Sequence, residues 1–188
     1  FFTRRLRPGA RPLPADPDVV VSPADGTMVI GGRVEAGSLF EAKDARFSLS
    51  QLLADGEAAR RLEGGSYLIT YLSPRDYHRV HSPVAGSVVA SSHVPGELFP
   101  VNDASLRREP GLFARNERFV TFLDGPAGFC AVAMIAAIGV GHITASYDPS
   151  ISTHEKVVGE VTRKRYDERP QLARGDELEP AEALLRDA

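Results

Sequence analysis

Short runs of β-branched and aromatic residues, separated by turns rich in Pro and Gly, constrain the fold of this chain most. These runs fall at residues 18–35, 66–74, 86–94, 117–147 and 156–166. Their length and composition are typical of strands, and the turns between them are typical of hairpins. Residues 47–62 have the leucine spacing of a helix, with Ser48 or Ser50 as the cap and Gly56 as its limit. The pattern predicts a mostly β (α+β) fold, with rolled, barrel-like antiparallel sheets and short helices.

The length of 188 residues and the hydrophobic content of 43% allow one domain with a sizeable core. We expect this domain to span residues 1–170, beginning with an extended arm rich in Pro and Arg at residues 1–18. A divergent tail follows at residues 171–188, where Glu, Ala, Leu and Arg dominate and no β-branched residue occurs. This composition favours a loop with a short helix, or disorder. Because the chain begins at Phe1 without a methionine, we also expect a segment to precede it.

Charge and cysteine content narrow the classes of partner and compartment. The net charge of −3 gives no general attraction for nucleic acid. The first twelve residues hold four arginines and no acidic residue. Such an end is compatible with contact to an anionic membrane surface, but an ordered or frayed arginine-rich terminus without such a role is the interpretation that this local composition favours. No segment has the roughly 18 consecutive apolar residues of a membrane-spanning helix. Cys130 is the single cysteine, so no disulfide forms within the chain, and its apolar neighbours predict a buried, unreactive thiol.

One turn sequence occurs twice. Residues 22–26 read Ser-Pro-Ala-Asp-Gly and residues 82–86 read Ser-Pro-Val-Ala-Gly, and an apolar strand follows each. Proline fixes φ at such a turn and glycine allows the chain to reverse. Two interpretations stay open: two similar hairpins, or an internal repeat whose turns meet in space. The first copy contains Asp25, and the second directly follows His78 and His81.

The two histidines are the candidate acid–base groups. Imidazole titrates near neutral pH and can accept or donate a proton. A carboxylate beside it, Asp25 or Asp76, would fix its tautomer. Histidines with a purely structural role are the alternative, and no metal site is expected because a third ligand at suitable spacing is missing. The serines near these turns do not lie in a nucleophile elbow, so the sequence names no nucleophile; they are Ser22, Ser73, Ser82 and Ser87.

Six blocks of sequence carry a family likeness. They read FFTRRLRPGARP, VSPADGTMV, ITYLSPRDYHRVHSPVAGSV, VPGELFPVN, LFARNERFV and IAAIGVGHI. In this order and spacing the chain resembles phosphatidylserine decarboxylase over about residues 1–145, with a weaker echo at RGDEL, residues 174–178. The resemblance implies that family's fold and a lyase of phospholipid biosynthesis, which converts phosphatidylserine to phosphatidylethanolamine and CO2.

The resemblance also implies roles for particular residues. Asp25 would pair with His81 to activate a serine for self-cleavage of the zymogen, and His78 would act as the acid of the decarboxylation step. The cut serine would become a pyruvoyl group, whose ketone forms a Schiff base with the substrate amine and accepts electrons as CO2 leaves. Phosphatidylserine and an anionic membrane surface are the implied partners. We expect a peripheral protein on the cytoplasmic membrane face, without nucleic acid.

The sequence departs from the family after RGDEL. The family carries its serine in a Leu-Gly-Ser-Thr block shortly beyond, whereas this chain continues EPAEALLRDA and has no Ser, Thr or Cys after Thr162. The pyruvoyl group is therefore not encoded in this chain, and we expect a truncation, an altered reading frame or divergence. A small α chain carrying the group and a homodimer are open as partners. A non-catalytic lipid-binding homologue and a hydrolase using Asp25, His81 and a nearby serine are the alternatives.

Overall fold

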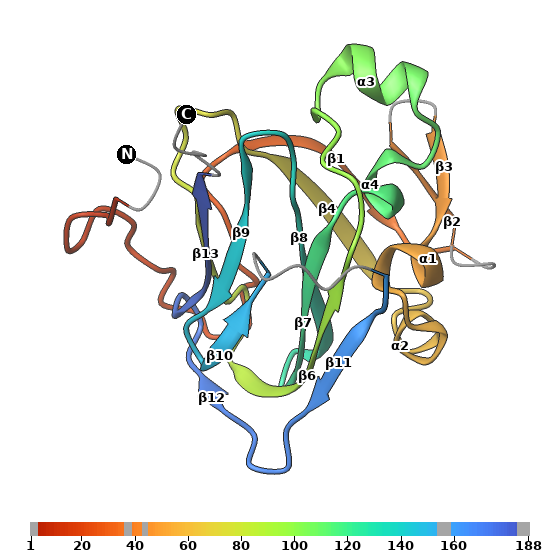
Figure 1. The fold of residues 1–188 in the computed structure, drawn as a ribbon. Helices are drawn as coiled ribbons and strands as arrows, with labels where there is room; N and C mark the ends of the chain where they lie inside the picture. The colour runs from red at the N-terminus through yellow and green to blue at the C-terminus, as the bar shows by residue number, and fades with distance from the viewer. Residues whose placement is uncertain (1–3, 36–38, 43–44, 154–158, 184–188) are drawn as a thin grey trace.

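The computed structural model describes residues 4–35, 39–42, 45–153 and 159–183, and its strands pair antiparallel in open sheets (Figure 1). The five-stranded sheet contains β6 (Gly86–Val94), β7 (Arg118–Gly125), β8 (Gly128–Ile135), β11 (Thr162–Arg165) and β12 (Gln171–Leu172). The four-stranded sheet contains β5 (Arg79–His81), β9 (Val140–Ala145), β10 (Asp148–Ser152) and β13 (Glu177–Ala183). Two further pairs are β1 (Thr27–Arg33) with β4 (Ser66–Tyr71), and β2 (Leu39–Ala42) with β3 (Ala45–Ser48). The predicted mostly β fold with short helices is confirmed.

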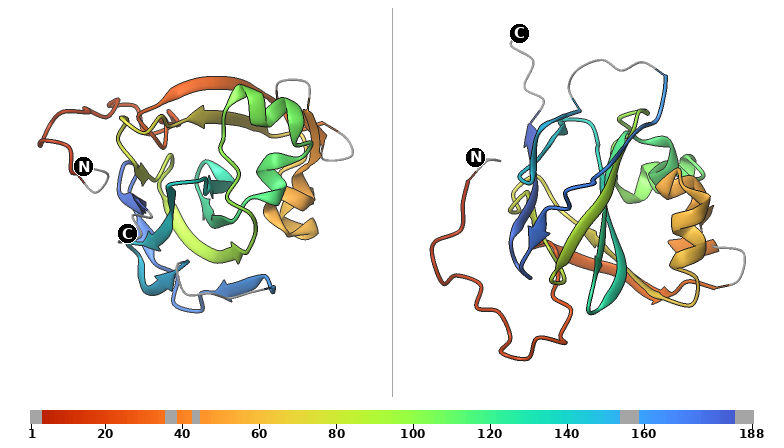
Figure 2. Two further views of the ribbon diagram at one scale, coloured as in Figure 1. Left: turned by 45° about the horizontal axis from the view of Figure 1, so that its top comes forward. Right: turned by 90° about the horizontal axis from the view of Figure 1, so that it is seen from below.

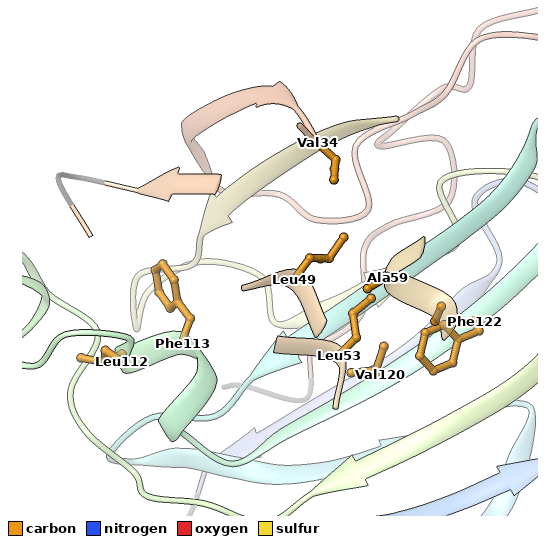
Figure 3. Packing of buried hydrophobic residues seen from close by; sticks show 9 residues of the cluster. Val34, Leu49, Leu53, Ala59, Leu112, Phe113, Val120 and Phe122 are labelled. Atoms are coloured by element: carbon orange, nitrogen blue, oxygen red, sulfur yellow. The ribbon is translucent and has the colours of Figure 1, made fainter. Parts of the chain in front are cut away.

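Strand β7 is the centre of the core because both of its faces are covered. Val120 and Phe122 point toward the short helices α1 (Leu49–Leu53), α2 (Gly56–Arg61) and α4 (Leu112–Arg115), as Figure 3 shows. Phe119 and Leu123 belong to the two clusters that the four-stranded sheet covers. Each such buried side chain stabilises the fold by roughly 1.5–3 kcal/mol. The molecule therefore has three layers: helices, the five-stranded sheet and the four-stranded sheet.

The C-terminal segment is part of the sheets, so the predicted helix or disorder is wrong for residues 171–183. Strand β12 pairs with β6, and β13 lies between β5 and β9. Leu178 on β13 is fully buried against Val80 and Val88. Packing of this side chain outweighs the weak helix preference of the surrounding Glu and Ala residues. The domain boundary at residue 170 stays a prediction.

The predicted helix at residues 47–62 is two short helices. Ala54 has a left-handed backbone with φ of 49°, which ends α1, and the Asp55 carboxylate caps α2 by accepting from two backbone N–H groups. Ser48 stands at the start of α1, but its hydroxyl contacts Ser50 and caps no backbone N–H. The sequence did not predict α4 or α3 (Asp103–Arg108).

The N-terminal arm, residues 4–21, contains neither helix nor strand. This agrees with the prediction for residues 4–18, but the strand predicted to start at residue 18 is wrong for residues 18–21, because β1 begins only at Thr27. Figures 1 and 2 show it on the side of the molecule that carries β13, away from α1 and α2. Within the described ranges, no helix is both long and apolar enough to cross a membrane. The strand predicted within residues 156–166 is confirmed as β11 over Thr162–Arg165, although residues 156–158 lie outside the described part. Cys130 on β8 is partly buried, and burial raises its pKa, as expected for an unreactive thiol.

Candidate active site at the paired Ser-Pro turns

The two Ser-Pro turns meet in space and bond to each other in the same way from both sides. The N–H of Val21 donates to the Pro83 carbonyl at 3.1 Å, and the N–H of His81 donates to the Pro23 carbonyl at 2.8 Å. In each case the residue before the Ser-Pro pair bonds the proline of the other turn. The reading of a repeat whose turns meet is therefore confirmed in its geometry. This pairing places Asp25 and His81 on adjoining segments.

The serine hydroxyl of each Ser-Pro turn donates a hydrogen bond to a carbonyl within its own turn. Ser22 donates to the Ala24 carbonyl at 2.8 Å, and the fully buried Ser82 donates to the Val84 carbonyl at 2.7 Å. A hydroxyl in this local bond closes its own turn and is not offered to an imidazole. The hydrolase alternative, which needs a serine hydroxyl on His81, gains no support from either residue.

His81 is held from both ring nitrogens. Its Nδ1 lies 2.8 Å from the Gly175 carbonyl, and its Nε2 lies 3.0 Å from the Tyr77 hydroxyl. A carbonyl only accepts, so this network assigns the proton to Nδ1 and makes Nε2 the acceptor of the phenol proton. The Tyr77 ring also stacks on the imidazole, with centroids 5.7 Å apart. Burial raises the pKa of Tyr77, which keeps its hydroxyl a neutral donor.

His78 has a different environment. Its side chain is buried, with 3% of the residue exposed, and its Nδ1 lies 2.9 Å from the Asp76 carbonyl. Burial lowers the pKa of His78, with the Asp76 bond acting in the opposite direction. The imidazole is therefore uncharged at neutral pH, and it can take up a proton as the pH falls. Main-chain carbonyls thus orient both histidines at Nδ1.

Asp25 forms no hydrogen bond with the His81 ring, so the structure does not contain the direct pairing that the resemblance implies. Its carboxylate instead pairs with Arg11 of the N-terminal arm, with Nε 3.0 Å from Oδ1 and Nη2 2.7 Å from Oδ2. A guanidinium carries a fixed charge and matches a carboxylate with two nitrogens, while both nitrogens of His81 already have partners. The Oδ2 atom is shielded from solvent and accepts no hydrogen bond of good geometry. Its capacity as an acceptor is therefore only partly used.

Asp76, the other candidate carboxylate, also does not bond an imidazole. Its Oδ2 accepts from the Ser73 N–H at 2.8 Å, and this bond is the main cause of the lowered pKa of Asp76. The side chain closes the turn that precedes His78. Its structural contribution is the backbone carbonyl that orients His78.

An open hollow of about 440 Å³ lies at the first Ser-Pro turn. It is lined by Arg11, Ser22, Ala24, Asp25, Gly26, Thr27 and Asp76. Gly26 sets the approach of this turn to β4, because a Cβ atom there would lie only 2.4 Å from the Tyr71 carbonyl oxygen. The hollow is polar and carries two carboxylates with one arginine. It could receive a cationic group or a hydrogen-bond donor beside Asp25.

Three residues that contact the candidate groups were missed by sequence reasoning: Arg11, Tyr77 and Gly175. Gly175 lies in the turn of residues 173–176. Its backbone N–H donates to the Ser82 carbonyl at 2.8 Å. The chain then enters β13, where Glu177 is paired with His81. The RGDEL stretch could have indicated the turn that contains Gly175, because an Arg-Gly-Asp sequence is typical of a turn. The two other histidines that the structure describes have partners elsewhere: His93 bonds Glu117, and His142 bonds Ser152.

Comparison with known proteins gives the same family along nearly the whole chain. The family model described as phosphatidylserine decarboxylase matches residues 1–178. A phosphatidylserine decarboxylase proenzyme of Anaeromyxobacter sp. (strain K) is 46% identical over 178 residues, covering 95% of this chain and 63% of the relative. Proenzymes of the same name from Myxococcus xanthus (44% identity, 95% and 62% coverage) and Brevibacillus brevis (40%, 95% and 64%) are also similar.

The chain therefore spans less than two thirds of the length of these relatives. The match extends beyond the predicted residue 145, through RGDEL to Leu178. Leu178 belongs to the core cluster that also contains Val80. On these grounds the chain belongs to the phosphatidylserine decarboxylase family.

Proposed function

We propose that this chain provides the framework of a phosphatidylserine decarboxylase, which converts phosphatidylserine to phosphatidylethanolamine and CO2. The observation that carries the proposal is the position of His81. Its ring lies against the 173–176 turn, from which the chain runs along β5 into β13 and to the end of the family match at Leu178. In the family, the residue to be activated follows this point.

His81 is proposed as the base of self-cleavage. With Nδ1–H bound to the Gly175 carbonyl, Nε2 is the atom that can accept a proton. A hydroxyl that replaces the Tyr77 hydroxyl at Nε2 can pass its proton to the ring. Asp25 would add negative charge beside this position through the partly satisfied Oδ2, without bonding His81 directly.

The pyruvoyl group of the family supplies a ketone that accepts electrons when the carboxylate is lost. The residues present include acid–base groups that suit a pyruvoyl group, but they do not include the hydroxyl from which it would form. His78 and His81 offer acid–base groups three residues apart in the sequence. The shielded Asp25 oxygen offers an acceptor on the turn that bonds the His81 segment. The precursor hydroxyl is not among residues 163–188, which contain no Ser, Thr or Cys. We propose that it is supplied by a segment in the place of residues 179–188 or by a separate small chain.

His78 is proposed as the proton donor of the decarboxylation step. Its Nδ1 is occupied by the Asp76 carbonyl, so Nε2 is the atom that would deliver the proton. Because burial lowers the pKa of His78, the charged form is a minor species at neutral pH. Turnover that needs this form should rise as the pH falls toward the pKa of His78.

The proposed partner is an anionic lipid surface at the cytoplasmic face, which the arm would approach. Arg4 donates to the Arg75 carbonyl at 2.7 Å, and Arg11 pairs with Asp25, so these two arginines have roles inside the protein. Arg5 and Arg7 are exposed and are the better candidates for lipid contact. Each would add about 1 kcal/mol at an anionic surface. A homodimer remains a further proposal.

The test is a fusion in which the family's Leu-Gly-Ser-Thr segment and its strand replace residues 179–188. We expect this fusion to release labelled CO2 from phosphatidylserine carrying the label in its carboxylate. His78→Ala in the fusion should leave self-cleavage intact but lower CO2 release by about 10²–10⁴-fold, as expected for loss of an acid. His93→Gln is the matched control, since this histidine bonds Glu117 away from the site. A fusion that cuts itself and binds vesicles without releasing CO2 would support the non-catalytic lipid-binding homologue instead.

A further inference from the structure

Arg174 donates hydrogen bonds to three main-chain carbonyls of the N-terminal arm. Its Nη1 donates to Asp16 at 2.6 Å and to Val19 at 2.7 Å, and its Nη2 donates to Pro14 at 2.6 Å. These bonds join segments more than 150 residues apart in the sequence. A planar guanidinium suits this task because its donors form a rigid fork. Arg174 therefore fixes residues 14–19 of the arm to the 173–176 turn.

The same turn orients His81 through the neighbouring residue. The Gly175 carbonyl accepts from the His81 Nδ1–H at 2.8 Å, while the Leu13 side chain of the arm lies where a side chain on this glycine would begin. A Cβ atom on Gly175 would lie 2.9 Å from Leu13 Cδ1, and the φ angle of 88° favours glycine. A glycine peptide rotates easily unless its surroundings hold it. The arm and the imidazole thus both lie next to Gly175.

We propose that Arg174 is a positioning residue for His81: by clamping residues 14–19 onto the 173–176 turn, it keeps the Gly175 carbonyl on the imidazole Nδ1. This inference rests on the proposed role of His81 as the base. The clamp has a second consequence, because the arm that Arg174 holds also carries Arg11, the partner of Asp25. Arg174 therefore bears on the placement of both His81 and Asp25.

The test compares Arg174→Ala, Arg174→Lys and the control Arg169→Ala in the 188-residue chain. Arg169 is exposed and lies five residues before Arg174 in the sequence. Two readouts are followed: hydrogen exchange of the amides in residues 15–21, and the nitrogen-15 NMR signal of the protonated His81 Nδ1. In Arg174→Ala we expect amide exchange at least about tenfold faster and a weakened or lost Nδ1–H signal, since local opening becomes easier. For Arg174→Lys we expect an exchange rate and an Nδ1–H signal between those of the parent and Arg174→Ala, because one ammonium does not match the three carbonyls as a guanidinium does. Arg169→Ala should match the parent in both readouts.

Two results would overturn the inference. Faster exchange of the arm with an unchanged His81 signal would show that the clamp does not position the imidazole. Unchanged exchange and an unchanged signal would show that the clamp itself adds nothing. If Arg174→Ala does not fold, the Lys variant carries the same comparison. Neither readout involves lipid, cleavage or CO2, so a failure here is distinct from a failure of the proposed decarboxylase function.

Discussion

A buried carboxylate outside the candidate site gives a prediction of stability with a defined pH dependence. Asp148 accepts from Lys164 Nζ at 2.5 Å and from the Tyr166 hydroxyl at 2.8 Å, both at Oδ2. Its Oδ1 accepts from the backbone and the hydroxyl of Ser150. Burial alone would raise the pKa of Asp148, but these donors outweigh it and hold the pKa well below its usual range. The carboxylate joins β10 to β11 and to the residue that follows β11.

Replacing Asp148 with Asn keeps the shape of the side chain and removes its charge. The ion pair with Lys164 is lost. The amide NH2 of the new side chain then faces hydrogen-bond donors in place of a carboxylate oxygen that accepted from them. Charge-assisted bonds of this kind are worth about 1.5–3 kcal/mol each, and Ser91 still partners Tyr166. We therefore expect Asp148→Asn to lower the free energy of unfolding by about 2–3 kcal/mol at pH 7. For a chain of this size, that corresponds to roughly 5–10 °C in Tm.

The pH dependence has a fixed sign. Because the folded pKa of Asp148 is lower than its unfolded value, its contribution is fully present above the unfolded pKa and is lost as pH falls through the folded pKa. The gap between parent and Asp148→Asn should thus be largest at pH 7 and shrink by pH 3 in urea unfolding. Asp124→Asn is the control, since its exposed pair with Arg61 should contribute less than about 1 kcal/mol. A gap below about 0.5 kcal/mol at pH 7, or one that grows on acidification, would show that the charged Asp148 carboxylate does not stabilise the fold.

Three further predictions concern β13, the first Ser-Pro turn and the arm. Leu178→Ala should cost about 2–5 kcal/mol in urea unfolding, because the side chain is fully buried; a loss under 1 kcal/mol would place β13 outside the core. Gly26→Ala should lower Tm, because its Cβ would meet a β4 carbonyl oxygen at 2.4 Å, whereas Gly56→Ala has open space and should not. Replacing Arg5 and Arg7 with Ala, or adding roughly 0.5 M salt, should weaken binding to vesicles containing phosphatidylserine; equal binding of the parent to neutral vesicles would contradict this.

The fold could be predicted where local composition and packing agree. The β-branched runs that became β6, β7 and β8 are strands in the sequence pattern and in the structure. Strand β13 was missed because its sequence, ELEPAEA, has no β-branched residue and favours a helix locally. Its partners β5 and β9 lie far away along the chain, and pairing with them decides its conformation. Local propensity contains no information on such partners.

The sequence predicted where the candidate site lies, but it did not predict the hydrogen-bond partners of Asp25 and His81. The repeated Ser-Pro turn placed Asp25 near the two histidines, and the turns do meet. The acceptor of His81 is a carbonyl 94 residues away, which no spacing rule reveals. The partner of Asp25 depends on where the arm lies, and an arm without helix or strand has no register to read from the sequence. Tertiary contacts therefore determine which groups pair.

The most direct test of the account is the intact mass of the chain with and without the family's C-terminal segment. The 188-residue chain should remain one species near 20.3 kDa. The fusion that replaces residues 179–188 with the Leu-Gly-Ser-Thr segment should split in two, and His81→Ala in that fusion should slow the cut by about 10²–10⁴-fold, as expected for loss of a general base. Splitting of the 188-residue chain itself, or cleavage of the His81→Ala fusion at the parent rate, would contradict the proposed role of His81.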